Sequence, residues 1–108
     1  MNNKIIVIVG PTAVGKTYVS VELAKRLNTE IISADSIQIY KKMNIGSAKI
    51  TNNEKQGIVH HMIDIADPDE NYSVSDFKED SENIIDSMLS NEKIPIIVGG
   101  SGLYVNSL

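Results

Sequence analysis

The sequence predicts an α/β fold in which helices flank a parallel β-sheet. Short runs of β-branched residues alternate with longer stretches whose apolar residues recur at helical spacing. Two of the apolar runs lead directly into glycine-rich turns, at residues 10–17 and 99–102. This alternation is typical of strand–helix–strand units, in which the two strands lie parallel. At 108 residues the chain is expected to form one domain, residues 1–108.

The first strand–helix–strand unit covers about 30 residues. Residues 4–9 form a β-branched run without polar alternation, which predicts a central strand buried on both faces. A helix is expected over residues 16–27, ended by Asn28, and a second strand over residues 30–34 leads into Asp35. The inward stripe of the helix is predicted from its apolar spacing to be Val19, Leu23, Ala24 and Leu27.

The second half is expected to add two strands and a helix. The pattern weakens over residues 41–57, which we interpret as a lid or excursion from the core. Strands are expected at 61–65 and 94–98, and between them Ser73 and Asp76 form the capping box of a helix near residues 75–89. The inward residues of that helix are predicted to be Phe77, Ile84, Ile85, Met88 and Leu89. A last helix has only begun where the sequence stops, so we expect a core truncated at its C-terminus, the N-terminal part of a longer protein.

Composition excludes several classes of function. The chain has no cysteine, which excludes disulfides, thiolate metal sites and thiol catalysis. A formal net charge of -4 argues against nucleic-acid binding by this segment alone, although basic residues elsewhere in a longer protein could supply it. The apolar N-terminal run is too short for a signal sequence or a membrane span. We therefore expect a cytoplasmic, monomeric protein without membrane contact.

The segment GPTAVGKT at residues 10–17 matches the phosphate-binding pattern G-x-x-x-x-G-K-[ST] in full. A buried strand is expected before it and an amphipathic helix after it, which is the context the pattern requires, so a plain glycine turn with a surface lysine is disfavoured. In such a P-loop the backbone N–H groups surround an anion at the positive end of a helix dipole. Lys16 would reach the terminal phosphate oxygens and Thr17 a bound Mg²⁺. The residues predicted to hold a diphosphate or nucleotide are Gly10, Pro11, Thr12, Ala13, Val14, Gly15, Lys16 and Thr17.

A phosphate-binding loop does not identify the reaction, because kinases, nucleotide-hydrolysing switch proteins and transferases that release diphosphate all contain one. Asp35 ends the second strand, at the sheet edge where α/β folds bind ligands. It could hold magnesium through water, remove a proton from a nucleophile, or merely cap the next helix. Adjacent imidazoles at His60 and His61 would point to opposite faces of a strand, which disfavours a shared metal.

Several stretches resemble the N-terminal part of the bacterial tRNA dimethylallyltransferase (tRNA isopentenyltransferase) family over nearly the whole chain. Beside the P-loop these are DSIQIY at 35–40, NIGSAK at 44–49, HHMIDI at 60–65, DPDENYS at 67–73 and PIIVGGSGLY at 95–104. Together they are far more specific than a P-loop alone. The resemblance covers residues 4–108, with residues 51–58 the least distinctive part.

The resemblance implies transfer of a dimethylallyl group from dimethylallyl diphosphate to the exocyclic N6 amine of the adenosine 3′ to the anticodon in tRNA, with Mg²⁺. It implies that residues 12–17 hold the donor's diphosphate and that Asp35 is the general base. The adenosine would be flipped out of its stack to reach the base. Contacts with the tRNA anticodon stem-loop are implied for Asp35, Ser36, Ile37, Gln38 and Ser101.

Two positions depart from the family's pattern. Ser101 stands where threonine is usual in G-G-T-G-L-Y; it keeps the hydroxyl and loses a packing methyl. Val14 stands where a small residue is frequent, and little effect is expected because the backbone alone is used there.

Three alternatives stay open. A P-loop small-molecule or nucleotide kinase would need arginines near the transferred phosphoryl group, and the one arginine, Arg26, lies mid-helix away from the loop. An isopentenyltransferase acting on free adenine nucleotides is the nearest chemical rival. The chain could also be a poorly active or non-catalytic part of a longer enzyme whose remaining part binds tRNA.

Overall fold

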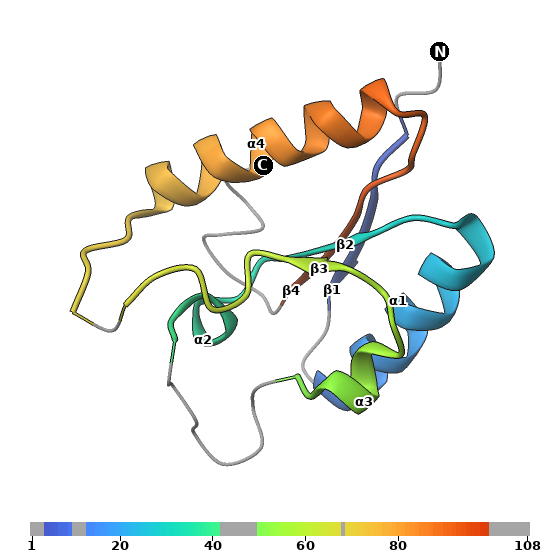
Figure 1. The fold of residues 1–108 in the computed structure, drawn as a ribbon, viewed down its shortest axis with the longest axis horizontal. Coiled ribbons are helices and arrows are strands. Elements are labelled where there is room, and N and C mark those ends of the chain that lie inside the picture. Colours follow the sequence, from blue (N-terminus) through green and yellow to red (C-terminus); the bar gives the residue numbers. More distant parts are fainter. Residues whose placement is uncertain (1–3, 10–12, 42–49, 68, 100–108) are drawn as a thin grey trace.

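The computed structural model describes residues 4–9, 13–41, 50–67 and 69–99. Four parallel strands form one sheet, with helices on both of its faces (Figure 1). The strands are β1 (Ile6–Val9), β2 (Ile31–Ser33), β3 (His60–His61) and β4 (Ile96–Gly99). The helices are α1 (Ala13–Leu27), α2 (Ser36–Ile39), α3 (Asn52–Lys55) and α4 (Val74–Ser90). None of the helices in these ranges is long and apolar enough to cross a membrane.

The sheet has the order β1-β4-β2-β3, and every described pair is parallel. β4 lies between β1 and β2, so residues at the end of the described chain sit in the middle of the sheet. Ile97 of β4, for example, is in register with Val7 on one side and Ile32 on the other. The predicted parallel α/β fold is confirmed, and the carboxyl ends of its strands meet at one edge.

The two faces of the sheet carry separate clusters of buried apolar residues. On one face, Ile32 and Ile97 pack with α4 through Phe77, Ile85 and Met88. On the other, Ile31 and Ile96 pack with α1 through Val21 and Ala24. Figure 1 shows α4 along one side of the sheet, with α1 and α3 along the opposite side. The alternation of side chains along β2 and β4 assigns neighbouring residues to opposite layers.

Helix α4 forms as the sequence predicts. The Ser73 hydroxyl accepts from the backbone N–H of Asp76, and the Asp76 carboxylate accepts from that of Ser73, which completes the capping box. The helix begins at Val74, one residue earlier than predicted, and ends at Ser90. Of the predicted inward residues, Phe77, Ile85 and Met88 are buried, and Ile84 and Leu89 pack against the same cluster.

Two predictions about the first unit are wrong. β1 is not buried on both faces: Ile5, Val7 and Val9 are 43 to 55% exposed, because α4 covers β2 and β4 on that face and leaves β1 open. The inward stripe of α1 is also rotated from the one predicted. Val19 is 51% and Leu27 38% exposed. The other two predicted residues are confirmed, since Ala24 is buried and Leu23 packs against the same cluster, and the further buried residues of α1 are Ser20 and Val21.

The third strand is shorter than predicted. β3 covers His60–His61, whereas residues 61–65 were expected to be extended. Positive φ angles at Met62 (68°) and Asp64 (54°) end the strand. The following N–H groups bond to α2 instead: Asp64 donates to the Gln38 carbonyl and Ile65 to the Ile39 carbonyl, both at 2.8 Å. The last carbonyl groups of α2, which have no N–H partner within the helix, therefore accept hydrogen bonds from the chain that follows β3.

Part of the segment 41–57 is helical. Thr51 and Glu54 form a capping box that opens α3, a sequence signal that was overlooked among the polar residues around it. α3 packs against α1, and the Lys25 ammonium donates to the Gln56 side-chain carbonyl. Residues 42–49 lie outside the described part of the chain, so the lid stays a prediction.

Candidate functional site

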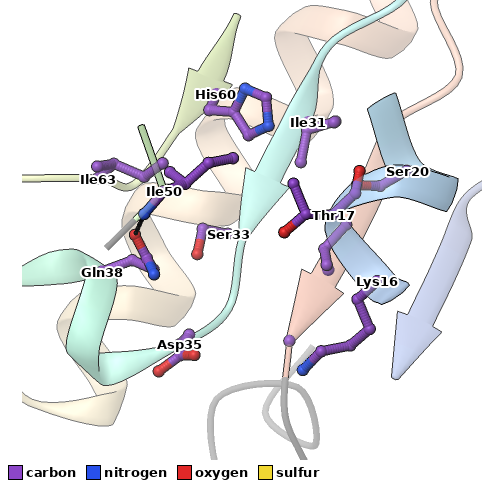
Figure 2. A pocket seen from close by; sticks show the side chains of 12 residues that line it. Lys16, Thr17, Ser20, Ile31, Ser33, Asp35, Gln38, Ile50, His60 and Ile63 are labelled. Carbon is purple, nitrogen blue, oxygen red and sulfur yellow. Dashed lines mark hydrogen bonds between the residues drawn. The ribbon is translucent and has the colours of Figure 1, made fainter. Parts of the chain in front are cut away.

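A pocket opens at the carboxyl edge of β2 and β4, between α1 on one side and the α2–β3 region on the other (Figure 2). Lys16 and Asp35 lie on opposite sides of one end of this pocket, with Thr17 and Ser33 further in. The pocket is lined by Lys16, Thr17, Ser20, Ile31, Ser33, Asp35, Gln38, Ile50, His60, Ile63, Val98 and Gly99. Two residues predicted from separate motifs, Lys16 and Asp35, therefore belong to one site.

β2 divides its side chains between this pocket and the core. Ile31, Ser33 and Asp35, two residues apart, line the pocket, whereas Ile32 and Ala34 belong to the cluster beneath α4. A strand has a side-chain period of two, so Ser33 follows from Asp35 by spacing alone. Ser33 was missed because its hydroxyl sits in a run interpreted only as a buried strand.

The N-terminal part of α1 forms the cationic side of the pocket. The helix begins at Ala13, three residues earlier than predicted, so residues 13–17 are its first turns. Its first N–H groups have no partner within the helix, and the helix dipole is positive at this end. Lys16 adds a full positive charge and Thr17 a hydroxyl oxygen on the next position. One turn further, the Ser20 hydroxyl donates to the Thr17 carbonyl at 3.0 Å.

The opposite side of the pocket is built from α2 and the chain that precedes α3. Asp35 directly precedes α2, and its carbonyl accepts from the N–H of Gln38 at 3.0 Å. The side-chain carbonyl of Gln38 accepts from the backbone N–H of Ile50 at 3.3 Å, as Figure 2 shows. This bond joins α2 to the segment that leads into α3 and orients the Gln38 amide at the pocket wall.

Apolar groups surround the other end of the pocket. Ile31, Ile50 and Ile63 lie there together with the imidazole of His60 (Figure 2). The Nδ1–H of His60 donates to the Ile58 carbonyl at 2.9 Å, so Nδ1 carries the hydrogen. Burial lowers the pKa of His60 below its ordinary value, opposed by that bond. The ring is therefore neutral at pH 7, and its Nε2 is a hydrogen-bond acceptor.

His61 belongs to a different cluster, as expected for adjacent residues of a strand. Its Nε2 bonds the Glu30 carboxylate at 2.7 Å, and the Lys93 ammonium donates to the other oxygen of Glu30 at 3.1 Å. The bond from His61, followed by that from Lys93, lowers the pKa of Glu30. Within the part of the chain that the structure describes, no three His, Cys, Asp or Glu side chains are grouped to hold a metal.

The predicted site residues are described to different extents. Lys16, Thr17, Asp35 and Gln38 line the pocket, whereas Gly15 is not among its lining residues. Ala13, Val14, Ser36 and Ile37 are described only in their helical backbone. The residues that lie outside the described ranges are Gly10, Pro11, Thr12 and Ser101. Pocket residues that the sequence analysis did not single out are Ser20, Ile31, Ser33, Ile50, Ile63, Val98 and, as a lining group, His60.

Comparison with known proteins gives one consistent family. Residues 38–108 match the family described as IPP transferase. The chain is 56% identical over its whole length to a tRNA dimethylallyltransferase of Alkaliphilus oremlandii, of which it covers 34%. It is 59% identical over 104 residues to one of Staphylococcus haemolyticus, of which it covers 31%. The chain thus spans about a third of the length of these relatives.

Solved structures agree with the sequence relatives. A full-length tRNA isopentenylpyrophosphate transferase of Bacillus halodurans matches 98% of this chain with a TM-score of 0.90 and 54% identity, and the match covers 35% of that protein. A eukaryotic dimethylallyltransferase acting on tRNA matches 99% of this chain with a TM-score of 0.90 and 39% identity, and the match covers 27% of that protein. The arrangement of strands and helices described above is therefore that of the corresponding part of those proteins.

Proposed function

The chain belongs to the IPP transferase family, and we propose that it supplies the donor site and the general base of a tRNA dimethylallyltransferase. The reaction moves a dimethylallyl group from dimethylallyl diphosphate to the N6 amine of the adenosine 3′ to the anticodon. The observation that carries the proposal is that Lys16 and Asp35 lie across one pocket in a chain of this family. The relatives' names support dimethylallyl transfer with tRNA as the acceptor, and this geometry supports separate roles for the two residues.

The N-terminus of α1 and Lys16 would bind the diphosphate of the donor. The positive helix end and the ammonium neutralise charge that grows on the diphosphate as the C1–O bond breaks. Because the group is fixed before the reaction, little reorganisation is needed at the moment of bond cleavage. The segment 10–12, which completes the phosphate-binding sequence, would add further backbone N–H groups.

Mg²⁺ fits the chemistry of this end of the pocket. Thr17 offers a hydroxyl oxygen beside Lys16, and Mg²⁺ favours oxygen ligands and is often held by few protein groups together with phosphate oxygens and water. Bound there, the ion would stabilise negative charge on the leaving diphosphate.

Asp35 would accept the proton of the adenosine amine. The lone pair of this amine is delocalised into the ring, so removal of a proton while the N6–C1 bond forms makes the attack feasible. The C1–O bond breaks, the N6–C1 bond forms, the proton goes to Asp35 and diphosphate leaves. Ser36, Ile37 and Gln38 follow Asp35 on α2 and are proposed to contact the extruded nucleotide.

The remaining parts of the proposal come from the sequence and its resemblance to the family. We propose Ser101 as a further tRNA contact, and a cytoplasmic monomer as the working form of the enzyme. A net charge of -4 on this chain leaves most of the binding of the tRNA backbone to basic residues outside it.

The test uses a hybrid enzyme in which this chain is joined to the rest of the Alkaliphilus oremlandii relative. It is incubated with labelled dimethylallyl diphosphate, Mg²⁺ and unmodified tRNA, and in parallel reactions with adenosine monophosphate in place of tRNA or with ATP and a small acceptor, with the relative itself run alongside. Label on the adenosine 3′ to the anticodon, located by mass spectrometry of nuclease fragments, is the expected result. Label on free adenosine monophosphate and none on tRNA would make the chain part of an adenine-nucleotide isopentenyltransferase. Loss of the ATP γ-phosphate to a small acceptor, without prenyl transfer, would make it a kinase.

A further inference from the structure

The pocket changes character along its length, and this change bears on which donor it accepts. Lys16 and Asp35 mark a charged end, whereas Ile31, Ile50, Ile63 and the neutral ring of His60 surround the other end (Figure 2). Charged and apolar ends in one pocket suit a ligand with a charged head and a hydrocarbon tail. The inference drawn here rests on the proposed function, in which that ligand is an allylic diphosphate.

The length of the apolar part follows from the strand that runs beneath it. Ile31 and Ser33 lie on the pocket face of β2, and Asp35 follows two residues after the strand ends; one step of two residues along a strand advances about 6 to 7 Å. A donor whose diphosphate lies at Lys16 and whose reacting carbon faces Asp35 would direct its tail past Ser33 toward Ile31. The single step from Ser33 to Ile31, about 6 to 7 Å, has the length of one branched five-carbon unit, and a second unit would meet Ile31 and His60.

Both residues at the inner end are held in place. Ile31 is 1% exposed, lies in register with Ile96 on one side and His60 on the other, and its N–H donates to the Val59 carbonyl at 2.9 Å. The ring of His60 is fixed by its bond to the Ile58 carbonyl. A wall supported by two neighbouring strands and a backbone hydrogen bond cannot move aside cheaply, because interiors are closely packed.

We propose that Ile31 and His60 form a floor that limits the hydrocarbon tail of the donor to one five-carbon unit. Neither residue touches the reacting atoms, so their role is selection of the donor by length. A ten-carbon allylic diphosphate is excluded because its second unit would have to occupy the space of these two side chains.

The experiment compares two neighbours on β2 that face opposite sides of the sheet. In the hybrid enzyme, Ile31→Ala removes part of the floor and so deepens the pocket. Ile32→Ala removes the same side-chain atoms from the cluster beneath α4. The measured quantity is kcat/KM for geranyl diphosphate divided by kcat/KM for dimethylallyl diphosphate, with tRNA as acceptor. We expect Ile31→Ala and His60→Ala each to raise this ratio at least tenfold, and Ile32→Ala to leave it within twofold of the parent.

The outcomes separate the floor from the reaction itself. If the parent hybrid transfers no dimethylallyl group while the relative does, the proposed function fails. If the parent transfers it and the ratio stays unchanged in both Ile31→Ala and His60→Ala, the floor is overturned; an equal rise in Ile32→Ala would also overturn it. Should an alanine variant be unfolded by circular dichroism, Ile31→Val decides, with a smaller expected rise and an unchanged ratio counting against the floor.

Discussion

The two faces of the sheet differ in the side chains that they gather over β2 and β4. Beneath α4, Ile32, Ala34 and Ile97 pack with Phe77 and Met88 in an apolar cluster. On the α1 face, the fully buried strand residues are Ile31 and Ile96 at the amino-terminal ends of β2 and β4, and a pocket with hydroxyl, carboxylate and ammonium groups occupies the carboxyl edge. Two successive residues therefore have different roles. Ser33, the last residue of β2, lines the pocket, whereas Ala34, directly after it, packs in the apolar cluster beneath α4 and contributes to stability.

The largest expected effect lies beneath α4. Phe77→Ala removes a fully buried ring and should lower the free energy of unfolding by about 3 to 5 kcal/mol. Urea denaturation of the hybrid enzyme measures it, with Tyr18→Ala as the control, because Tyr18 is 65% exposed on α1. Donor affinity of the folded Phe77→Ala protein should match that of the parent. Equal destabilisation by the two variants would contradict a core concentrated on this face.

The opposite pattern is expected at the pocket. Lys16→Ala should reduce kcat/KM for dimethylallyl transfer by roughly 10² to 10³, because a preorganised positive charge on the leaving diphosphate is lost. The free energy of unfolding should change by less than about 0.5 kcal/mol. Lys25→Ala, at the other end of the same helix, is the matched control and should keep the parent kcat/KM. A loss shared by both lysine variants would point to the helix as a whole.

A smaller effect tests the cluster at the amino-terminal edge of the sheet. Glu30→Gln should cost about 1 kcal/mol of unfolding free energy at pH 7, since the carboxylate bonds both His61 and Lys93. These bonds hold the pKa of Glu30 below its ordinary value of 4.5, so the stability they contribute is present above that pH. It is lost as pH falls through the lowered pKa. Parent and variant should therefore converge in acid, and a constant difference down to pH 3 would contradict the assignment.

The smallest effect concerns His60. Burial lowers its pKa in the folded protein, so between that pKa and the ordinary value of 6.5 the unfolded chain binds more protons. Stability should therefore fall as pH drops below 6.5, by at most about 1.4 kcal/mol per pH unit for one proton. His60→Asn should make the slope of unfolding free energy between pH 7.5 and 5.5 shallower. An unchanged slope would mean that the imidazole is as hydrated in the folded protein as in the unfolded chain.

Much of the fold could be predicted because its signals are local. The capping box at Ser73 and the apolar spacing after it located α4 to within a residue at either end. The alternation of apolar runs and helical stretches predicted a parallel sheet. The order β1-β4-β2-β3 could not be predicted, since it depends on which runs pair across the whole chain. That order explains the error over β1, because an apolar run looks the same at the open end of a sheet as in its centre.

The site shows the same division between local and distant information. Lys16, Thr17 and Asp35 were predicted from motifs, and the structure brings them to one pocket. Ser33 could have been predicted, because it stands two residues before Asp35 and side chains two residues apart in extended chain point to the same side. Ile50 and Ile63 could not be found, because their place at the pocket depends on how the chain returns past α2. Val19 was predicted to face inward and is exposed, because helical spacing defines an apolar stripe but does not fix which side of the helix meets the sheet.

The central claim, that this pocket performs prenyl transfer with Asp35 as the base, is tested most directly by single-turnover transfer in the hybrid enzyme. Asp35→Asn is compared with Asp69→Asn, an exposed aspartate away from the pocket, under saturating dimethylallyl diphosphate and tRNA. We predict that Asp35→Asn slows formation of the N6–C1 bond at least about 100-fold while binding of both substrates is kept, and that Asp69→Asn reacts at the parent rate. Transfer by Asp35→Asn at the parent rate would contradict the account.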